Sequence, residues 1–156
     1  MAIEIERTFL VRDERWRQDA DGGEYYSQGY LSSDPQNCIR VRIAGERAWL
    51  GIKRATSALR RLEYEYPIPL QDAREILEQI VPRERIDKWR YHVPWGKHLW
   101  EIDVFDKANA GLVVAEIELQ DEDEDFERPP WLGQEVSDDP RYYNMNLARN
   151  PYPTWK

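Results

Sequence analysis

Residues 101–119 read EIDVFDKANAGLVVAEIEL, two short alternating segments joined by a turn-forming stretch. Side chains two residues apart on a β-strand point to the same side, so Glu101 and Asp103 share one face of the first segment. Glu116 and Glu118 share one face of the second, and the opposite faces are apolar. The central DKANAG is rich in residues that interrupt regular structure. The pattern predicts two strands, at 99–105 and 112–119, each with an acidic and an apolar face.

The same alternation recurs along the rest of the chain. Further strands are expected at residues 3–11, 25–31, 38–43, 48–53, 62–68 and 86–93. Helical spacing of apolar residues predicts only two helices, at 71–81 and at roughly 140–149. Eight strands with few helices indicate a mainly β (α+β) fold. We expect an eight-stranded antiparallel closed β-barrel, because closure removes exposed strand edges.

The composition is that of one folded domain over residues 1–156. Hydrophobic residues make up 41% and charged residues 33% of the chain, which is typical of a globular rather than a disordered protein. The formal net charge of -8 argues against nucleic acid and anionic membranes as partners. The opening MAIEIERTFL lacks the basic start of a signal peptide, so a cytoplasmic location is expected. The single cysteine, Cys38, is expected to be a structural thiol.

Charges of one sign are sorted by strand. Beyond the acidic pairs already named, the shared faces carry Glu4 with Glu6, Glu63 with Glu65 beside Arg61, Arg40 with Arg42, and Lys88 with Arg90, and Lys53 ends its strand. An ordinary solvated sheet face, the simplest interpretation of any one strand, mixes both signs because like neighbours repel. Gathered carboxylates need a cation, and Mg²⁺ and Mn²⁺ take oxygen ligands. Gathered Arg and Lys need an anion. Metal-assisted phosphoryl transfer inside a lumen satisfies both requirements.

Eight short segments follow one another along the chain. They are EIERTFLV (4–11), QGYL (28–31), IRVRI (39–43), GIK (51–53), RLEYEY (61–66), DKWRY (87–91), EIDVF (101–105) and AEIEL (115–119). In order and spacing they resemble the CYTH superfamily, also called the triphosphate tunnel metalloenzymes. The ending WLGQEVSDDPRYYNMNLA (131–148) is similar to that of the short bacterial members. The resemblance implies an eight-stranded antiparallel tunnel with a few helices packed outside. It also implies hydrolysis of a triphosphate with Mg²⁺ or Mn²⁺.

The resemblance also assigns roles to the charged residues. Glu4, Glu6, Glu116 and Glu118 become the expected metal-binding acids. The expected phosphate cradle consists of Arg40, Arg42, Lys53, Arg61, Lys88 and Arg90. Lys53 and Lys88 are also candidates for catalysis by proton transfer, because a lysine among other cations readily lowers its pKa. Secondary candidates are Thr8, Tyr30, Glu63, Glu65, Glu101 and Asp103, the acids either as ligands or as partners that orient the cations. A metal-activated water is the expected nucleophile.

One position departs from the family pattern. The family's opening ExExK motif has lysine where this chain has Thr8, and that lysine faces the tunnel and helps to hold phosphate. Thr8 keeps the face and a hydroxyl but loses a charge-assisted contact, worth about 1.5–3 kcal/mol. Three interpretations stay open: a slower enzyme, a different substrate, or an engineered substitution.

Hydrolysis of inorganic triphosphate (tripolyphosphate) to pyrophosphate and phosphate is the expected function, since short bacterial members of this layout tend to be tripolyphosphatases. The expected partner is inorganic triphosphate or another triphosphate-bearing small molecule. One alternative is a nucleotide triphosphatase or a class IV adenylate cyclase-like enzyme, which requires a pocket for a base or sugar. Another is a non-catalytic polyphosphate-binding module whose activity was lost with the lysine at position 8.

Several conspicuous residues receive no catalytic role. His92 and His98 have no ligand partner in the sequence and are expected to be ordinary polar residues. The acidic run 121–127 is expected to be a solvated helix face or loop. Trp131 and Trp155 are candidates for capping the tunnel or for a homodimer contact.

Overall fold

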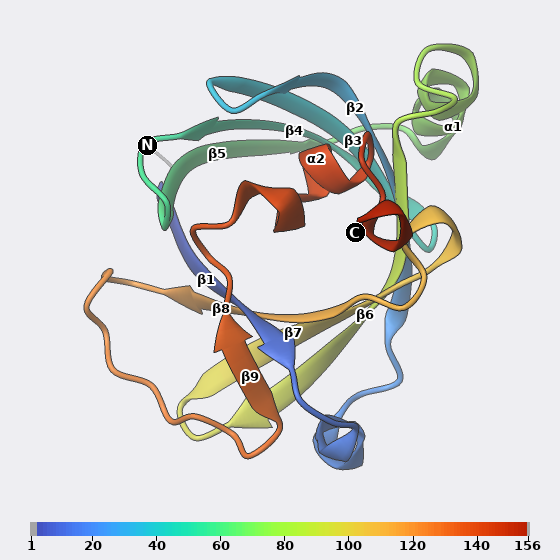
Figure 1. The fold of residues 1–156 in the computed structure, drawn as a ribbon. Helices are drawn as coiled ribbons and strands as arrows, with labels where there is room; N and C mark the ends of the chain where they lie inside the picture. The colour runs from blue at the N-terminus through green and yellow to red at the C-terminus, as the bar shows by residue number, and fades with distance from the viewer. Residues whose placement is uncertain (1–2, 156) are drawn as a thin grey trace.

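The computed structural model describes residues 3–155, in which eight strands form a closed ring (Figure 1). The strands are β1 (Ile3–Val11), β2 (Glu24–Asp34), β3 (Asn37–Ala44), β4 (Arg47–Ala55), β5 (Arg60–Pro67), β6 (Arg85–Trp95), β7 (His98–Phe105) and β8 (Val113–Leu119). Their order around the ring is β1-β5-β4-β3-β2-β6-β7-β8, and β8 pairs again with β1. All neighbours are antiparallel. The predicted eight-stranded antiparallel fold is confirmed.

A short ninth strand, which the sequence analysis did not predict, lies outside the ring. β9 (Leu132–Glu135) pairs with the end of β1, where Phe9 is opposite Glu135 and Val11 is opposite Leu132. Its four residues, LGQE, are too few to show a reliable alternation. β1 therefore pairs with three strands: β5 at its start, β8 along its middle and β9 at its end.

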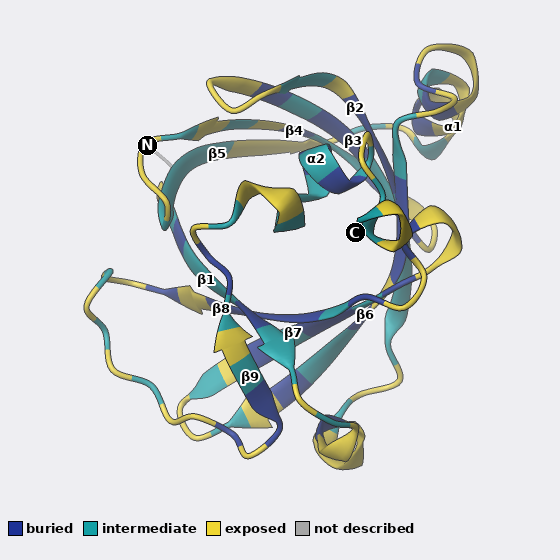
Figure 2. Ribbon diagram, in the orientation of Figure 1, coloured by how far each residue is buried: buried dark blue, intermediate teal, exposed yellow. Residues whose placement is uncertain are grey.

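The main hydrophobic core lies on the outer side of the ring. The outward residues of β1, β6, β7 and β8, such as Ile5 and Ile102, pack with Trp16, Trp100 and Trp131. Trp16 comes from the 3-10 turn η1 (Arg15–Asp19), which follows β1. This part of the ring is largely buried, whereas β4 and β5 show more exposed residues (Figure 2). The apolar faces predicted by alternation are thus covered by the connections between strands.

The first predicted helix is confirmed and packs outside the ring. α1 (Leu70–Gln79) buries Ala73 and Leu77 against the outer side of β3 and β4, where Val41 and Ala48 lie. Ile80 is 64% exposed and follows the last helical residue, so the helix is slightly shorter than expected. None of the helices within residues 3–155 has the length and apolar character that crossing a membrane requires.

The second predicted helix was wrong in both continuity and position. The structure has a 3-10 turn, η3 (Pro140–Tyr142), then Tyr143 in an extended conformation with ψ 133°, then α2 (Asn144–Leu147). α2 lies within the outline of the ring instead of outside it (Figure 1). Met145 and Leu147 pack there on a cluster of apolar residues carried by the strands, namely Tyr30, Cys38, Ile86, Phe105 and Val114. The reason is physical: one end of the lumen is apolar, and α2 covers it.

Candidate active site

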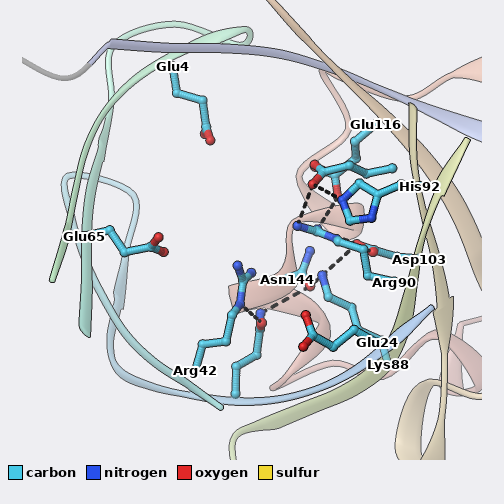
Figure 3. Close-up of polar contacts among 12 residues, drawn as sticks. Glu4, Glu24, Arg42, Glu65, Lys88, Arg90, His92, Asp103, Glu116 and Asn144 are labelled. Atoms are coloured by element: carbon cyan, nitrogen blue, oxygen red, sulfur yellow. Dashed lines mark hydrogen bonds and ion pairs between the residues drawn. The ribbon is translucent and has the colours of Figure 1, made fainter. Parts of the chain in front are cut away.

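The lumen of the ring holds a cavity of about 290 Å³. Every residue expected to bind metal or phosphate lines it: Glu4, Glu6, Arg40, Arg42, Lys53, Arg61, Lys88, Arg90, Glu116 and Glu118. Among the secondary candidates, Thr8, Tyr30, Glu63, Glu65 and Glu101 also line it, whereas Asp103 does not. Glu4, Arg42, Glu65 and Lys88 point into the lumen from different sides of the ring (Figure 3). Tyr142, Tyr143, Asn144 and Met145 line one end of the cavity.

The order of strands around the ring separates the two signs of charge. The strands β7, β8, β1 and β5 are consecutive neighbours and carry the acids. The strands β4, β3, β2 and β6 form the rest of the ring and carry most of the cations. We call these two halves the acidic wall and the basic wall; Arg61 on β5 is the cation of the acidic wall. Pairing between strands distant in the chain, β1 with β8 and β2 with β6, produces this arrangement.

On the acidic wall, carboxylates are direct cross-strand neighbours. Glu6 is paired with Glu118 across β1 and β8, and Glu101 is paired with Glu116 across β7 and β8. Burial, together with the nearby carboxylates of Glu116 and Glu4, raises the pKa of Glu6 well above its usual range. Burial and Glu4 also raise the pKa of Glu118. Like charges directly opposite each other destabilise a sheet, so this wall carries unmet negative charge.

Cations nonetheless lie close to several carboxylates of the acidic wall, Glu4 and Glu6 included. Lys53 Nζ lies 3.0 Å from Glu63 Oε2 and 3.3 Å from Glu4 Oε1. Arg61 lies 3.5 Å from Glu6 and 3.6 Å from Glu4, and Arg40 lies 3.1 Å from Glu65. Burial and Arg40 act to lower the pKa of Lys53, but the carboxylates of Glu4 and Glu63 outweigh them and raise it. The expectation of a lowered pKa at Lys53 was therefore wrong.

A buried ion triad lies where the basic wall meets the acidic wall, between β6 and β7. Asp103 is completely buried and accepts from Lys88 Nζ at 2.7 Å and from Arg90 Nε at 2.8 Å and Nη2 at 2.9 Å (Figure 3). Two cations and several hydrogen bonds hold the pKa of Asp103 far below its usual range, against the effect of burial. Burial lowers the pKa of Lys88 to about 8, an effect that Asp103 opposes and Arg90 reinforces. Asp103 thus orients two tunnel cations, the second of its two expected roles.

Thr8 faces the lumen, as its parity predicts, and is the cross-strand neighbour of Glu116. Its backbone N–H donates to Ser137 Oγ at 2.9 Å, and that hydroxyl also contacts Glu135 Oε2 at 2.7 Å. Glu135 in turn pairs with Arg7, whose side chain is on the outer side of β1. The backbone at position 8 is therefore held from outside the ring, independently of its side chain.

Three residues at the site were missed by the sequence analysis. Gln28 and Asn144 are neutral amides that contact Arg42 and Lys88, respectively. His92 was expected to be an ordinary polar residue, but its ring lies 3.6 Å from Glu101 and 3.2 Å from Asp21. Hydrogen bonding to Glu101 raises the pKa of His92, although burial opposes it. The signal was present, because position 92 has the same parity as 88 and 90.

The other residues without a predicted role are accounted for by the structure. His98 pairs at 2.6 Å with Glu124 in the acidic run, which forms a loop. Trp131 is 1% exposed and packs in the core outside the ring, so it neither caps the tunnel nor offers a surface for a dimer contact. Trp155 packs against Tyr142 and Tyr152. Cys38 is buried, and burial raises the pKa of its thiol, which favours an inert structural role.

The acidic wall matches a hard divalent cation in donor chemistry but is not closed around one. Within residues 3–155, no three His, Cys, Asp or Glu side chains are grouped closely enough to form a ready metal site. Glu4, Glu6, Glu116 and Glu118 offer only carboxylate oxygens, the donors that Mg²⁺ and Mn²⁺ prefer. The pKa of Glu6 is raised partly by the negative charge of neighbouring carboxylates, and a bound cation would offset that charge. In charge and donor type these residues fit a divalent ion.

Comparison with known proteins agrees with this geometry. A model of the CYTH domain matches residues 2–143. An inorganic triphosphatase of Acetivibrio thermocellus is 43% identical over 156 residues, covering 100% of this chain and 99% of that protein. An inorganic triphosphatase of Nitrosomonas europaea is 35% identical over 154 residues, covering 93% and 96%. The crystal structure of an inorganic triphosphatase superposes with a TM-score of 0.66 at 33% identity and covers 95% of both chains. This chain belongs to the CYTH domain family.

Proposed function

We propose that this protein hydrolyses inorganic triphosphate to pyrophosphate and phosphate inside the tunnel. The observation that carries the proposal is a cavity in which a basic wall and an acidic wall face each other. A phosphate chain bridges such walls because its oxygens accept from guanidinium and ammonium groups while also binding a divalent ion. Two full-length relatives named inorganic triphosphatase support the same substrate.

We further propose that Glu4, Glu6, Glu116 and Glu118 hold Mg²⁺ or Mn²⁺. A divalent ion there supplies charge neutralisation, polarisation of a phosphoryl oxygen and activation of the attacking water. The remaining acids act through the cations: Glu63 and Glu65 orient Lys53 and Arg40, and Asp103 orients Lys88 and Arg90.

The basic wall is proposed to bind the phosphate chain and to manage one proton. Arg40, Arg42, Arg61 and Arg90 bind phosphoryl oxygens, and Lys53 adds a further ammonium. As water forms its bond to the terminal phosphorus, the anhydride bond breaks and negative charge develops on the leaving pyrophosphate. Lys88, with a pKa of about 8, is the residue proposed to hold a proton for that oxygen.

The experiment that tests this function is a phosphate-release screen over tripolyphosphate, pyrophosphate, ATP and thiamine triphosphate with Mg²⁺, Mn²⁺ or EDTA. We expect tripolyphosphate to be hydrolysed fastest and EDTA to abolish release. A higher kcat/KM for ATP supports the nucleotide alternative instead. Binding of tripolyphosphate without release, seen as a raised Tm, identifies the binding-module alternative. A cytoplasmic location and a homodimer stay predictions, to be checked by fractionation and light scattering.

The pH dependence of kcat/KM should report Lys88. In the free enzyme its ammonium is present below the pKa of about 8 and is lost as the pH rises through that value. We therefore expect kcat/KM for tripolyphosphate to fall above about pH 8. Lys88→Arg keeps the positive charge at all accessible pH values, so its profile should lack that fall even if its maximum is lower. If kcat/KM of the wild type and of Lys88→Arg falls in the same way at alkaline pH, a group other than Lys88 causes the fall.

Restoring lysine at position 8 should strengthen substrate binding. Thr8 faces the cavity beside Glu116, so a lysine there enters the lumen. We expect Thr8→Lys to raise kcat/KM for tripolyphosphate about tenfold, the equivalent of about 1.4 kcal/mol and within the range of one charge-assisted hydrogen bond. Thr8→Gln, similar in length but neutral, is the control. A folded lysine variant without any gain indicates that the site has been rebuilt around threonine.

A further inference from the structure

Within the described residues, Arg42 differs from the other cations of the tunnel in having a neutral partner and no carboxylate partner. Arg40, Lys53, Arg61, Lys88 and Arg90 each form at least one ion pair. Within residues 3–155, Arg42 forms none. Its Nε instead donates to Oε1 of Gln28 at 2.8 Å. Arg42, which lies on β3 and lines the cavity, therefore keeps a positive charge that no carboxylate in this part of the chain neutralises.

Gln28 is the centre of a chain of neutral contacts. Its side chain is completely buried on β2, directly opposite Arg42 in the sheet. Nε2 of the same amide donates to the Tyr30 hydroxyl at 2.8 Å and lies 3.5 Å from Oδ1 of Asn144. Asn144 Oδ1 accepts from Lys88 Nζ at 2.9 Å, so Arg42 and Lys88 are joined through two amides (Figure 3).

A glutamine at this place is costly unless the cation has another use. Arg42 is close to Arg40 and Arg90, and burial together with these two cations lowers the pKa of Arg42 to about 10. A carboxylate at position 28 would offset this burial and repulsion, because a buried charge without a counter-charge is strongly unfavourable. An amide gives the guanidinium a fixed direction without neutralising it. Such a preorganised, uncompensated guanidinium suits an incoming phosphate.

We propose that Gln28 is a positioning residue for triphosphate binding: its amide fixes Arg42 as an uncompensated cation and, through Asn144, groups Arg42 with Lys88 as one phosphoryl subsite. The inference rests on the proposed function. It separates the cations of the basic wall into those balanced by carboxylates, Lys88 among them, and Arg42, whose charge is reserved for the substrate.

Gln28→Glu is the sharpest test, because it keeps the shape and gives Arg42 a carboxylate. We expect KM for tripolyphosphate to rise about tenfold or more, the value of one charge-assisted contact. kcat should change much less, and Tm without ligand should stay the same or rise. The increase in Tm on adding tripolyphosphate should shrink in parallel. A purely structural role for Gln28 gives the opposite pattern, a lowered Tm with an unchanged KM.

Gln36→Glu is the matched control, because Gln36 Oε1 accepts from Arg54 Nε at 3.1 Å in the same way on the exposed surface. It should leave KM unchanged. If Gln28→Glu does not fold, Asn144→Asp decides by the same criterion, since it gives Lys88 a second carboxylate. A folded variant with wild-type KM overturns the inference alone. A wild-type protein that neither binds nor hydrolyses tripolyphosphate overturns the proposed function and the inference with it.

Discussion

Glu116→Gln is expected to lower kcat/KM for tripolyphosphate by about 100-fold or more, equivalent to at least about 2.7 kcal/mol of transition-state stabilisation. Glu116 lines the cavity next to Glu6, opposite Thr8 and Glu101. The substitution keeps the size of the side chain and removes one of the carboxylates proposed to hold the ion. The measurement is steady-state phosphate release as a function of Mg²⁺ and Mn²⁺ concentration. Activity of Glu116→Gln should require more metal than the wild type needs.

Without metal, the carboxylates of the acidic wall should lower the stability of the fold, so replacing one of them should raise Tm. The pKa of Glu6 is raised in the folded protein, so the folded state holds a proton that the unfolded chain releases. The protein therefore loses stability as the pH rises from the usual pKa of a glutamate to the raised pKa of Glu6 in the folded state. Glu6→Gln should therefore raise Tm in EDTA at pH 7, and this gain should vanish near pH 4. Glu118→Gln, on the more exposed carboxylate, is the control for a smaller gain. Full wild-type activity in EDTA contradicts the metal proposal.

Asp103→Ala is expected to be the most destabilising single substitution in the tunnel. Asp103 is completely buried and binds both Lys88 and Arg90. Its removal takes away the carboxylate that pairs with Lys88 and leaves Arg90 with longer contacts, at 3.3 Å to Glu101 and 3.6 Å to Glu116. Breaking a buried pair costs about 3–5 kcal/mol, which for a chain of this size lowers Tm by roughly 10 °C. Circular dichroism melting checks this value. A loss of only a degree or two contradicts a structural role for the triad.

Two comparisons sharpen the Asp103 experiment. Glu14→Ala removes an exposed partner of Arg17 at 2.9 Å and should leave Tm nearly unchanged, because exposed pairs contribute little. Tripolyphosphate should raise Tm more in Asp103→Ala than in the wild type, since phosphate oxygens would then supply the missing negative charge. Equal stabilisation of both proteins by the ligand indicates that Lys88 and Arg90 do not contact it.

Much of this structure could be predicted because strands have a period of two. Alternation gave all eight ring strands, and parity placed residues such as Arg40 and Glu116 on the lining of one cavity. Alternation cannot give the order of strands around the ring. It therefore could not reveal that the acidic strands are consecutive neighbours, or that Glu6 is paired with Glu118 across two of them. Those facts follow from pairings between distant segments.

Residues without charge escaped prediction for a different reason. Gln28 shares the parity of Tyr30, but an amide carries no sign of charge that marks it as part of a site. Asn144 was assigned to a continuous helix outside the ring, because the helical spacing around it does not show the extended break at Tyr143. What places α2 in the lumen is an apolar tunnel end, which becomes visible only once Ile86, Phe105 and Val114 are brought together.

The pairing of β1 with three other strands has a consequence for how the chain folds. Ile5 pairs with Leu119 and Phe9 with Glu135, so the ring closes only after most of the chain is available. Contacts this distant in sequence slow folding and leave strand edges unpaired in the meantime. β1 is one of these edge strands, and it carries Glu4 and Glu6. Inward-pointing charges on an edge strand hinder its pairing with other chains. We therefore expect the carboxylates that line the tunnel also to limit aggregation while the chain folds.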